Sequence, residues 1–431
     1  MDARISPTRS IRGTVSLPAD KAICHRAALL AALATDATEI SPWASGDDCQ
    51  RTLSVLQGLG VPVSRTDGGV RIDGVGLAGL RVPAGPLHCG DSGTTIRLAC
   101  GILAGQPFTS RLTADRSLSQ RPMRRIIEPL ARMGARFERG GGSGEIYPPL
   151  ILTGRRPLAG IEYQMPVASA QVKSAILLAG LYADRATSVV EPVPTRDHTE
   201  RLLSRFGVPV RREGQRIIIE PPQGDLRSGG QVQVPGDPSS AAFFLVAAAV
   251  VPDSELTIRD MSLNPTRVRF LEVLTRMGAA IRCDAKPDPW EPRGTVTVRS
   301  SALRGVTIAP EEVPQLIDEL PVLMVAACAA EGETRFEGVG ELRVKETDRL
   351  RSMTAGLAAM GAQVQSGSSR VVVRRSRLRG ADVDSFGDHR TAMSLAVAGL
   401  FAAGDTRIRG AECVSKSLHN FFDLLTSIRR G

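Results

Sequence analysis

Six short polar motifs place Asp, Ser, Thr, Lys or Arg side chains immediately ahead of apolar segments. Hydroxyl and carboxylate side chains at the start of a helix accept hydrogen bonds from its free N–H groups. The same helix end carries about half a positive charge and attracts anions. The chemistry that these residues indicate is therefore anion binding at helix N-termini. The motifs are Asp20-Lys21, Asp91-Ser92-Gly93-Thr94, Ser169-Ala170-Gln171, Asp237-Pro238-Ser239, Asp318-Glu319 and Asp388-His389-Arg390.

Basic residues lie in or near the same motifs. A single basic residue close to a helix end is most often an ordinary solvated charge. A whole set tied to one recurring motif instead favours a basic surface that gathers an anionic ligand. The set comprises Lys21, Arg26, Arg97, Arg121, Lys173, Arg196, Lys345, Arg349, Arg390 and Lys416.

The motifs recur at intervals of 68 to 81 residues, which predicts an internal repeat. A second pattern keeps step with them: an amphipathic helix that ends in an apolar residue, a glycine and a small residue, followed by strand-like alternation. The glycine stands where a helix end needs a positive φ angle. Gly60, Gly134, Gly207, Gly278 and Gly361 hold this position.

Six repeat units of about 72 residues account for the chain. Each is expected to contain a strand, a buried helix, a strand, an amphipathic helix and two further strands. Segments such as 26–34 and 391–403 are apolar nearly all round, which predicts helices that are buried on every side. We therefore expect an α/β (α+β) fold, in which three units surround three buried helices in each of two globular domains.

Composition sets the class of protein. Hydrophobic residues make up 42% of the 431-residue chain and charged residues 23%, as in soluble globular proteins. The longest apolar run, 241–251, is too short for a membrane span, which needs about 20 residues. Residues 1–7 lack the apolar segment of a secretory signal. The seven cysteines are widely spaced without a CxxC motif, so we expect a cytoplasmic protein with free thiols.

The formal net charge of +9 permits two classes of partner. Nucleic acid is one, but the positive charge is scattered, and 11 Phe, 3 Tyr and 2 Trp are few for base stacking. Anionic small molecules fit at least as well. We expect small-molecule substrates, a monomer, and neither nucleic-acid nor membrane partners.

Other common functional motifs do not occur in the sequence or lack the context that they need. Residues 74–79 match GxGxxG but lead into Leu80-Arg81-Val82-Pro83 rather than a helix, so a dinucleotide site is not expected. The chain has no GxxxxGK[ST] phosphate loop. Its five histidines show no metal-ligand spacing. We expect no metal and no organic cofactor.

At the polar motifs, the chain resembles the EPSP synthase family of enolpyruvyl transferases over essentially its whole length. That family fold has two domains, each of three βαβαββ units with buried parallel helices (an inside-out barrel), and a ligand cleft between the domains. The resemblance implies one domain of residues 1–18 plus 237–431, a second of residues 19–236, and hinges near 17–20 and 234–238. The motifs that carry it are Pro18-Ala-Asp-Lys-Ala-Ile-Cys-His-Arg26, Gly90-Asp-Ser-Gly-Thr-Thr95, Gln120-Arg-Pro-Met123, Ser169-Ala-Gln-Val-Lys-Ser174, Thr195-Arg-Asp-His-Thr-Glu200, Asp237-Pro-Ser-Ser240, Asp318-Glu319, Arg343-Val-Lys-Glu-Thr-Asp-Arg349 and Gly387-Asp-His-Arg390.

The resemblance implies a reaction without metal or organic cofactor. Phosphoenolpyruvate gives its enolpyruvyl group to the 5-hydroxyl of shikimate 3-phosphate, and phosphate leaves by addition and elimination. In the family, the positions matched by Arg349 and Arg390 hold the carboxylate of phosphoenolpyruvate, a task suited to bidentate guanidinium groups. The positions implied for phosphoenolpyruvate as a whole are Lys21, Gly93, Arg121, Gln171, Arg349, Arg390 and Lys416.

The acceptor and the proton transfers are implied in the same way. Asp318 matches the base beside the attacking hydroxyl. Glu346 is the family's usual candidate for protonating the methylene carbon, with Lys21 as a rival. Because Lys345 and Arg349 are four residues apart, a helix would place them on one face and Glu346 on an adjacent one. The positions implied for shikimate 3-phosphate are Lys21, Ala22, Arg26, Ser169, Ala170, Gln171, Arg196, Asp318 and Lys345.

Three positions of the family pattern differ here, and one of them is Ser417-Leu418-His419 in place of Ser-Phe-Pro after the last lysine. Ala22 stands where the family has a serine that helps to hold the shikimate carboxylate. Asp91 replaces an asparagine, and its carboxylate would repel an anion unless it pairs with a neighbour such as Arg97. A phosphorylated acceptor without a carboxylate, for example a nucleotide, therefore remains an alternative. So does a non-catalytic anion-binding relative. Arg116 stands where the UDP-sugar branch has a catalytic cysteine, which argues against that branch.

Overall fold

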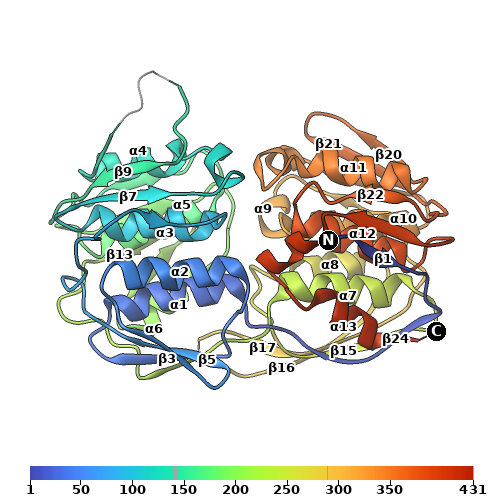
Figure 1. Ribbon diagram of the computed structural model, residues 1–431, viewed down its shortest axis with the longest axis horizontal. Helices are drawn as coiled ribbons and strands as arrows, with labels where there is room; N and C mark the ends of the chain where they lie inside the picture. The colour runs from blue at the N-terminus through green and yellow to red at the C-terminus, as the bar shows by residue number, and fades with distance from the viewer. Residues whose placement is uncertain (139–143, 289, 431) are drawn as a thin grey trace. The chain divides into compact units, whose positions relative to one another are not determined.

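The computed structural model describes residues 1–138, 144–288 and 290–430. The chain forms two compact units. Unit 1 consists of Met1–Pro18 with Pro235–Gly431, and unit 2 of Ala19–Val234. In Figure 1, unit 2 carries the blue to green part of the chain, and unit 1 carries the yellow-green to red part together with the N-terminal strands.

The described strands of unit 2 form three four-stranded sheets with one shared order. In each, two parallel strands lie side by side, and an antiparallel hairpin continues the sheet. This common order confirms the internal repeat. The sheets are β14 (Gln231–Gln233), β3 (Ala37–Ser41), β5 (Gly69–Asp73), β4 (Val63–Thr66); β6 (Leu87–His88), β7 (Thr109–Thr113), β9 (Leu150–Thr153), β8 (Arg136–Phe137); and β10 (Glu162–Gln164), β11 (Thr187–Val190), β13 (Arg216–Ile219), β12 (Val210–Glu213).

The described strands of unit 1 follow the same plan with additions at the chain ends. The C-terminal strand extends one sheet, and the first strand of the chain completes another. In order, the sheets are β16 (Ala280–Lys286), β17 (Arg293–Arg299), β15 (Glu255–Ser262), β2 (Ser10–Ser16), β24 (Arg429–Arg430); β18 (Thr307–Ile308), β19 (Glu333–Glu337), β21 (Arg370–Arg374), β20 (Gln363–Ser366); and β1 (Ala3–Ile5), β23 (Thr406–Arg409), β22 (Asp382–Asp384).

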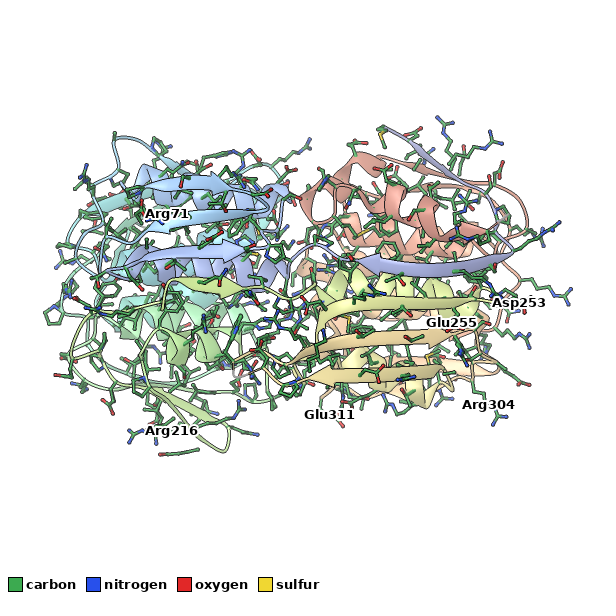
Figure 2. All side chains as sticks on the ribbon, turned by 90° about the horizontal axis from the view of Figure 1, so that it is seen from below. Arg71, Arg216, Asp253, Glu255, Arg304 and Glu311 are labelled. Carbon is green, nitrogen blue, oxygen red and sulfur yellow. The ribbon has the colours of Figure 1, made fainter. Side chains whose placement is uncertain are left out.

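Two repeats do not use the strand that precedes them in the sequence. β2 comes just before the first buried helix, yet it pairs in parallel with β15 in unit 1; Figure 2 shows it, in blue, beside the pale green β15. β14 precedes the fourth buried helix, yet it pairs in parallel with β3 in unit 2. The chain leaves one unit between these strands and their helices, so each strand stays with the sheet of the unit that the chain is leaving.

Three helices of each unit are buried along most of their length. In α7, every residue from Pro238 to Ala249 is buried. The segment predicted as 391–403 is helical only to Gly399, because Ala403 donates its N–H to Leu378 across a β-bridge instead of to the helix. The buried helices are α1 (Lys21–Leu33), α3 (Gly93–Ala104) and α5 (Ala170–Gly180) in unit 2, and α7 (Pro238–Val250), α10 (Leu320–Ala329) and α12 (His389–Gly399) in unit 1.

The second helix of each repeat has one buried face and one exposed face. Five of these helices end two residues before the glycines that the sequence singles out, and all five glycines have positive φ: 83° at Gly60, 107° at Gly134, 84° at Gly207, 95° at Gly278 and 86° at Gly361. This confirms the predicted helix ends. These helices are α2 (Asp47–Gly58), α4 (Arg124–Arg132), α6 (His198–Arg205), α8 (Arg269–Arg276), α11 (Arg349–Ala359) and α13 (Phe421–Ile428); the shorter elements are α9 (Val313–Leu316), η1 (Leu118–Gln120), η2 (Val339–Val344) and η3 (Ala411–Lys416).

Helices α3 and α5 lie side by side in the core of unit 2 (Figure 1). Their closest approach depends on Gly101. A Cβ atom added there would lie 2.3 Å from the carbonyl oxygen of Ala175 and 2.9 Å from its Cα. Both atoms belong to the backbone of a buried helix, so they cannot move aside as a side chain could.

Replacing Gly101 with alanine should therefore destabilise unit 2. Overpacking of this kind costs about 1–3 kcal/mol, which outweighs the helix preference of alanine over glycine. Urea unfolding followed by circular dichroism measures the loss. Gly224→Ala is the control, since no heavy atom lies within 4 Å of a Cβ at that position. Equal stability of the two variants would contradict the packing argument.

Candidate active site

The N-termini of five buried helices are capped by the side chains that the motifs predict. In each case a carboxylate or hydroxyl accepts a backbone N–H of the first turn, which leaves the positive end of the helix dipole beside the motif. The second cap is Ser92 rather than Asp91, whose Oδ1 accepts the N–H of Leu118 instead, at 3.1 Å. The caps are Asp20, Ser92, Ser169, Asp237 and Asp388.

The fifth buried helix differs, and Asp318 is not a cap. The position before α10 is Glu319, which has a helical backbone and makes no side-chain cap hydrogen bond. α9 runs into α10 through a tight turn, in which the N–H of Glu319 bonds to the carbonyl of Leu316 at 2.8 Å. The chain thus enters α10 from a helical turn, and the Asp318 carboxylate contacts arginine side chains.

Arg349, the first residue of α11, binds three carboxylates in unit 1. Its side chain is only 1% exposed. Nε lies 2.7 Å from Asp388 Oδ2, and Nη1 lies 3.1 Å from Asp318 Oδ1. Nη2 contacts Glu346. Burial by itself would lower the pKa of Arg349, but the three carboxylates outweigh it and raise the pKa. The guanidinium is thus a fixed, permanent charge.

Arg390, in the first turn of α12, meets the same aspartate. Its Nε lies 3.2 Å from Asp318 Oδ1, and its Nη1 donates to the Asp318 carbonyl at 3.2 Å. The predicted pair Arg349 and Arg390 therefore converges on one carboxylate. Asp388 bonds to the guanidinium of Arg349 and to the backbone N–H of Arg390, so it orients Arg349 and fixes the start of the helix that carries Arg390.

Lys345 and Glu346 do not lie on a helix with Arg349, contrary to the expectation from their spacing. Lys345 follows η2 with an extended backbone, and α11 begins only at Arg349. The reason is Asp348, whose carboxylate accepts the N–H of Arg351 at 3.0 Å and caps the helix there. Glu346 still reaches the guanidinium of Arg349 from the loop.

Lys345 is a partly desolvated cation beside this cluster. Its Nζ lies 4.0 Å from Glu341 Oε2, and its side chain is 29% exposed. Burial lowers the pKa of Lys345 to about 8, against the opposing effect of Glu341 and Asp318. Lys416 lies in the same unit, and its Nζ donates to the carbonyl of Gly387 at 3.3 Å, next to Asp388.

In unit 2, the start of α3 meets the start of α5. Nη1 of Arg97 donates to Gln171 Oε1 at 3.0 Å, and the Gln171 amide donates to Thr94 Oγ1 at 3.0 Å. A Cβ atom at Gly93 would lie 2.5 Å from Nη1 of Arg97 and 3.0 Å from Nη1 of Arg121. Glycine is therefore needed for these two guanidinium groups to approach the helix end. The structure brings Gly93, Arg121 and Gln171 together.

Two further groups of predicted residues lie at α1. Lys21 Nζ pairs with Asp48 Oδ2 at 2.9 Å, with both side chains 18% exposed. Arg26 is buried, and its guanidinium donates to Thr199 Oγ1, Ser174 Oγ and the Ala22 carbonyl at 2.8, 3.0 and 2.8 Å.

Lys173 was expected on the basic binding surface, and that expectation is wrong. Its side chain is fully buried, with Nζ 2.9 Å from Glu191 Oε1 and 2.6 Å from Glu200 Oε1. It lies in the fourth position of α5, on the side that faces β11 and α6 rather than at the helix end.

Two residues that contact the predicted site were not singled out as site residues, and a third, Arg97, was predicted only as part of the basic binding surface. Asp48 pairs with Lys21, and Asp388 orients Arg349 and fixes the start of the helix that carries Arg390. Arg97 contacts Gln171 and lies beside Gly93. Asp388 belongs to one of the recurring motifs and Arg97 follows shortly after another, so the repeat itself was the signal. Asp48 lies in the first turn of an amphipathic helix, where an acidic residue looks ordinary.

Comparison with known proteins identifies the family. The family described as EPSP synthase (3-phosphoshikimate 1-carboxyvinyltransferase) matches residues 5–425. The chain is 46% identical to the 3-phosphoshikimate 1-carboxyvinyltransferase of Nitrosococcus oceani, over 97% of this chain and 94% of that one. It is 48% identical to that of Acidithiobacillus ferrooxidans, over 97% and 95%. The EPSP synthase structure from Acinetobacter baumannii superposes with a TM-score of 0.87 at 39% identity, over 99% and 98% of the two chains.

The repeated sheets and buried helices, together with this match, define an enzyme of the transferase class. The chain belongs to the EPSP synthase family. The family resemblance and the fold class expected from the sequence are thereby confirmed. Among the described residues, no helix is long and apolar enough to cross a membrane, and no group of three or more His, Cys, Asp or Glu could hold a metal ion.

The lowered pKa of Lys345 has a consequence for stability. Between about pH 8 and its ordinary value of 10.5, the unfolded chain holds this proton while the folded chain releases it. The contribution of Lys345 to the free energy of unfolding therefore rises with pH across that window, and below it the buried charge lowers that free energy.

Lys345→Met should exceed the parent in free energy of unfolding by the largest margin near pH 7, and this margin should shrink toward pH 10. Urea unfolding at several pH values measures this. Lys286→Met, at an exposed position, is the control, and a gain independent of pH would contradict the lowered pKa.

Proposed function

We propose that the chain transfers the enolpyruvyl group of phosphoenolpyruvate to the 5-hydroxyl of shikimate 3-phosphate and releases phosphate. The observation that carries the proposal is the convergence of Arg349 and Arg390 on Asp318. Two guanidinium groups beside one carboxylate suit a site that binds an anionic substrate next to a base. The family membership supplies the reaction that such a site would serve.

Phosphoenolpyruvate carries a carboxylate and a phosphate, and each needs cations. Arg349 and Arg390 are assigned to the carboxylate, because planar guanidinium groups bind it through two parallel hydrogen bonds. Glu346 also contacts Arg349, so a substrate carboxylate at Arg349 would take over that contact. The phosphate is assigned to Lys21, Gly93, Arg121, Gln171 and Lys416.

The acceptor is assigned to residues at the starts of α1 and α5 and to two residues of unit 1. Ser169, Ala170, Gln171 and Arg196 take its phosphate. Ala22 and Arg26 lie on the side of its carboxylate. Lys21, Asp318 and Lys345 face its ring hydroxyls.

The chemistry follows from these positions. Asp318 accepts the proton of the 5-hydroxyl while the hydroxyl oxygen forms a bond to C2 of phosphoenolpyruvate. The methylene carbon takes up a proton, which gives a tetrahedral intermediate. Glu346 or Lys21 supplies that proton. Loss of a proton from the new methyl group then restores the double bond as the C2–O bond to phosphate breaks. Arg349 and Arg390 fix the carboxylate through both steps, which provides most of the orientation.

An acceptor without a carboxylate is the second candidate, and Ala22 is the observation that motivates it. The full-length relatives named as 3-phosphoshikimate 1-carboxyvinyltransferase do not favour it. We also infer a monomer in the cytoplasm that binds no nucleic acid. All assigned residues come from one chain, and the cysteines of the described residues are free thiols.

Arg390 offers a direct test of the assignment to phosphoenolpyruvate. Arg390→Lys keeps the charge but loses the fork, so KM for phosphoenolpyruvate should rise about tenfold, with a much smaller change in KM for the acceptor. Steady-state phosphate release measures both constants. Arg409→Lys, an exposed arginine of the same unit, is the control. Equal effects on both substrates would place Arg390 in a different pocket.

Ala22 tests the acceptor. Its N–H donates to Asp20 Oδ1 at 2.7 Å and its carbonyl accepts from Arg26, so a serine fits the first turn without disturbing the cap. If shikimate 3-phosphate is the acceptor, Ala22→Ser should lower its KM by up to about tenfold through a charge-assisted hydrogen bond, and by less if water fills the gap. KM for phosphoenolpyruvate is the internal control.

The parent enzyme decides the function in the same assay. Efficient phosphate release with phosphoenolpyruvate and shikimate 3-phosphate supports the proposal. Negligible turnover by the parent, without rescue by Ala22→Ser, would falsify it and leave a changed acceptor or a lost activity.

A further inference from the structure

A buried charge cluster lies in unit 2, next to residues that the proposed function assigns to the acceptor. It consists of Lys173 on α5, Glu191 directly after β11, and Glu200 on α6, and is called the Lys173 cluster. Lys173 Nζ lies 2.9 Å from Glu191 and 2.6 Å from Glu200. Arg212 adds a second positive charge, 3.7 Å from Glu191 Oε2. Lys173 and Glu191 are both fully buried, and the proposed chemistry uses neither.

The Lys173 cluster makes hydrogen bonds to both backbone polar groups of Thr195. Glu191 Oε1 accepts the backbone N–H of Thr195 at 3.1 Å and also its hydroxyl. Lys173 Nζ donates to the Thr195 carbonyl at 3.4 Å. The backbone N–H, the backbone carbonyl and the hydroxyl of Thr195 are thus all hydrogen-bonded to buried charged side chains. The next residue is Arg196, so the cluster fixes the backbone from which that arginine extends.

The same helices hold Arg26. Ser174 follows Lys173 on α5, and Thr199 precedes Glu200 on α6; the two hydroxyls lie 2.6 Å apart, and Arg26 donates to both. The cluster therefore joins α5, α6 and the 191–197 segment at the point where Arg26 enters from α1.

Stability does not explain such an arrangement well. Taking charges out of water costs free energy that their attraction barely repays, so a buried ion pair is commonly no better for stability than apolar residues of similar size. What it does provide is a fixed geometry, because each partner is satisfied in only one place.

We infer that Lys173 and Glu191 are positioning residues that hold Arg196 for the phosphate of the acceptor. This rests on the proposed function, in which Arg196 binds that phosphate. The residues act through Thr195 and touch no substrate. They extend the acceptor site to groups that the polar motifs alone do not assign to it.

Glu191→Gln tests the inference. The amide oxygen can still accept from Thr195, but the charge that holds Lys173 is lost. KM for shikimate 3-phosphate should rise about tenfold, while KM for phosphoenolpyruvate changes less than about twofold. The affinity ratio of shikimate 3-phosphate to shikimate, measured by calorimetry, should fall by a similar factor, since only the phosphorylated ligand engages Arg196. A loss of stability alone would not move this ratio.

Asp36→Asn is the matched control. Asp36 also lies in unit 2 and also accepts both the backbone N–H and the hydroxyl of one loop residue, Ser228, at 2.9 and 3.1 Å. Its loop is not assigned to either substrate. This variant should leave both KM values and the affinity ratio unchanged.

Arg196→Ala completes a double-mutant cycle. If positioning acts through Arg196, Glu191→Gln should add little to the acceptor KM in the Arg196→Ala background. Full additivity overturns the inference, and so does an unchanged affinity ratio in Glu191→Gln. An Arg196→Ala enzyme with an unchanged acceptor KM also overturns it, while continued turnover of shikimate 3-phosphate would leave the proposed reaction standing. Should Glu191→Gln fail to fold, Thr195→Val removes one of the same contacts and decides in the same assays.

Discussion

A helix can be buried on every side only if the N–H groups of its first turn find partners inside the protein. Each unit buries three such helices, and this constraint fixes much of the rest. Five N-termini are closed by the side chains of Asp20, Ser92, Ser169, Asp237 and Asp388. A capped helix end is polar and electropositive, so it is the place in an apolar core where charged side chains and anions can gather. The residues assigned to the substrates cluster near these ends.

The start of α10 is the exception to this capping pattern. At α10, a helical turn precedes the helix, and Glu319 at its start makes no side-chain cap hydrogen bond. The carboxylate of Asp318 binds the side chains of Arg349 and Arg390. Asp388 combines the two roles, since its Oδ1 accepts backbone N–H groups of α12 while its Oδ2 binds Arg349. The proposed base therefore differs from Asp388 in binding both arginine side chains.

Sequence predicted the features that follow from local rules. The repeat, the buried helices, their caps and the positive φ angles at the five glycines all reflect hydrogen bonding and backbone conformation within a few residues. It failed where distant segments decide. Lys173 looked like one more basic residue of a motif, but Glu191 and Glu200 take it out of the binding surface. The spacing of Lys345 and Arg349 predicted a shared helix face, and the cap at Asp348 prevented it.

The balance of charge in unit 1 bears on the choice between the two proton donors. The guanidinium of Arg349 is paired with three carboxylates, those of Asp318, Glu346 and Asp388. Under the proposed assignment, a substrate carboxylate at Arg349 must compete with Glu346, whose contact comes from a loop, rather than with Asp388, whose backbone bonds fix it to α12. A carboxylate that loses its guanidinium partner and gains an anion as neighbour holds a proton more readily. Binding of phosphoenolpyruvate would then itself prepare Glu346 to donate a proton. Glu346 is thus suited to the proposed role of acid, and Lys21, which is assigned to the phosphate of the same substrate, remains its rival.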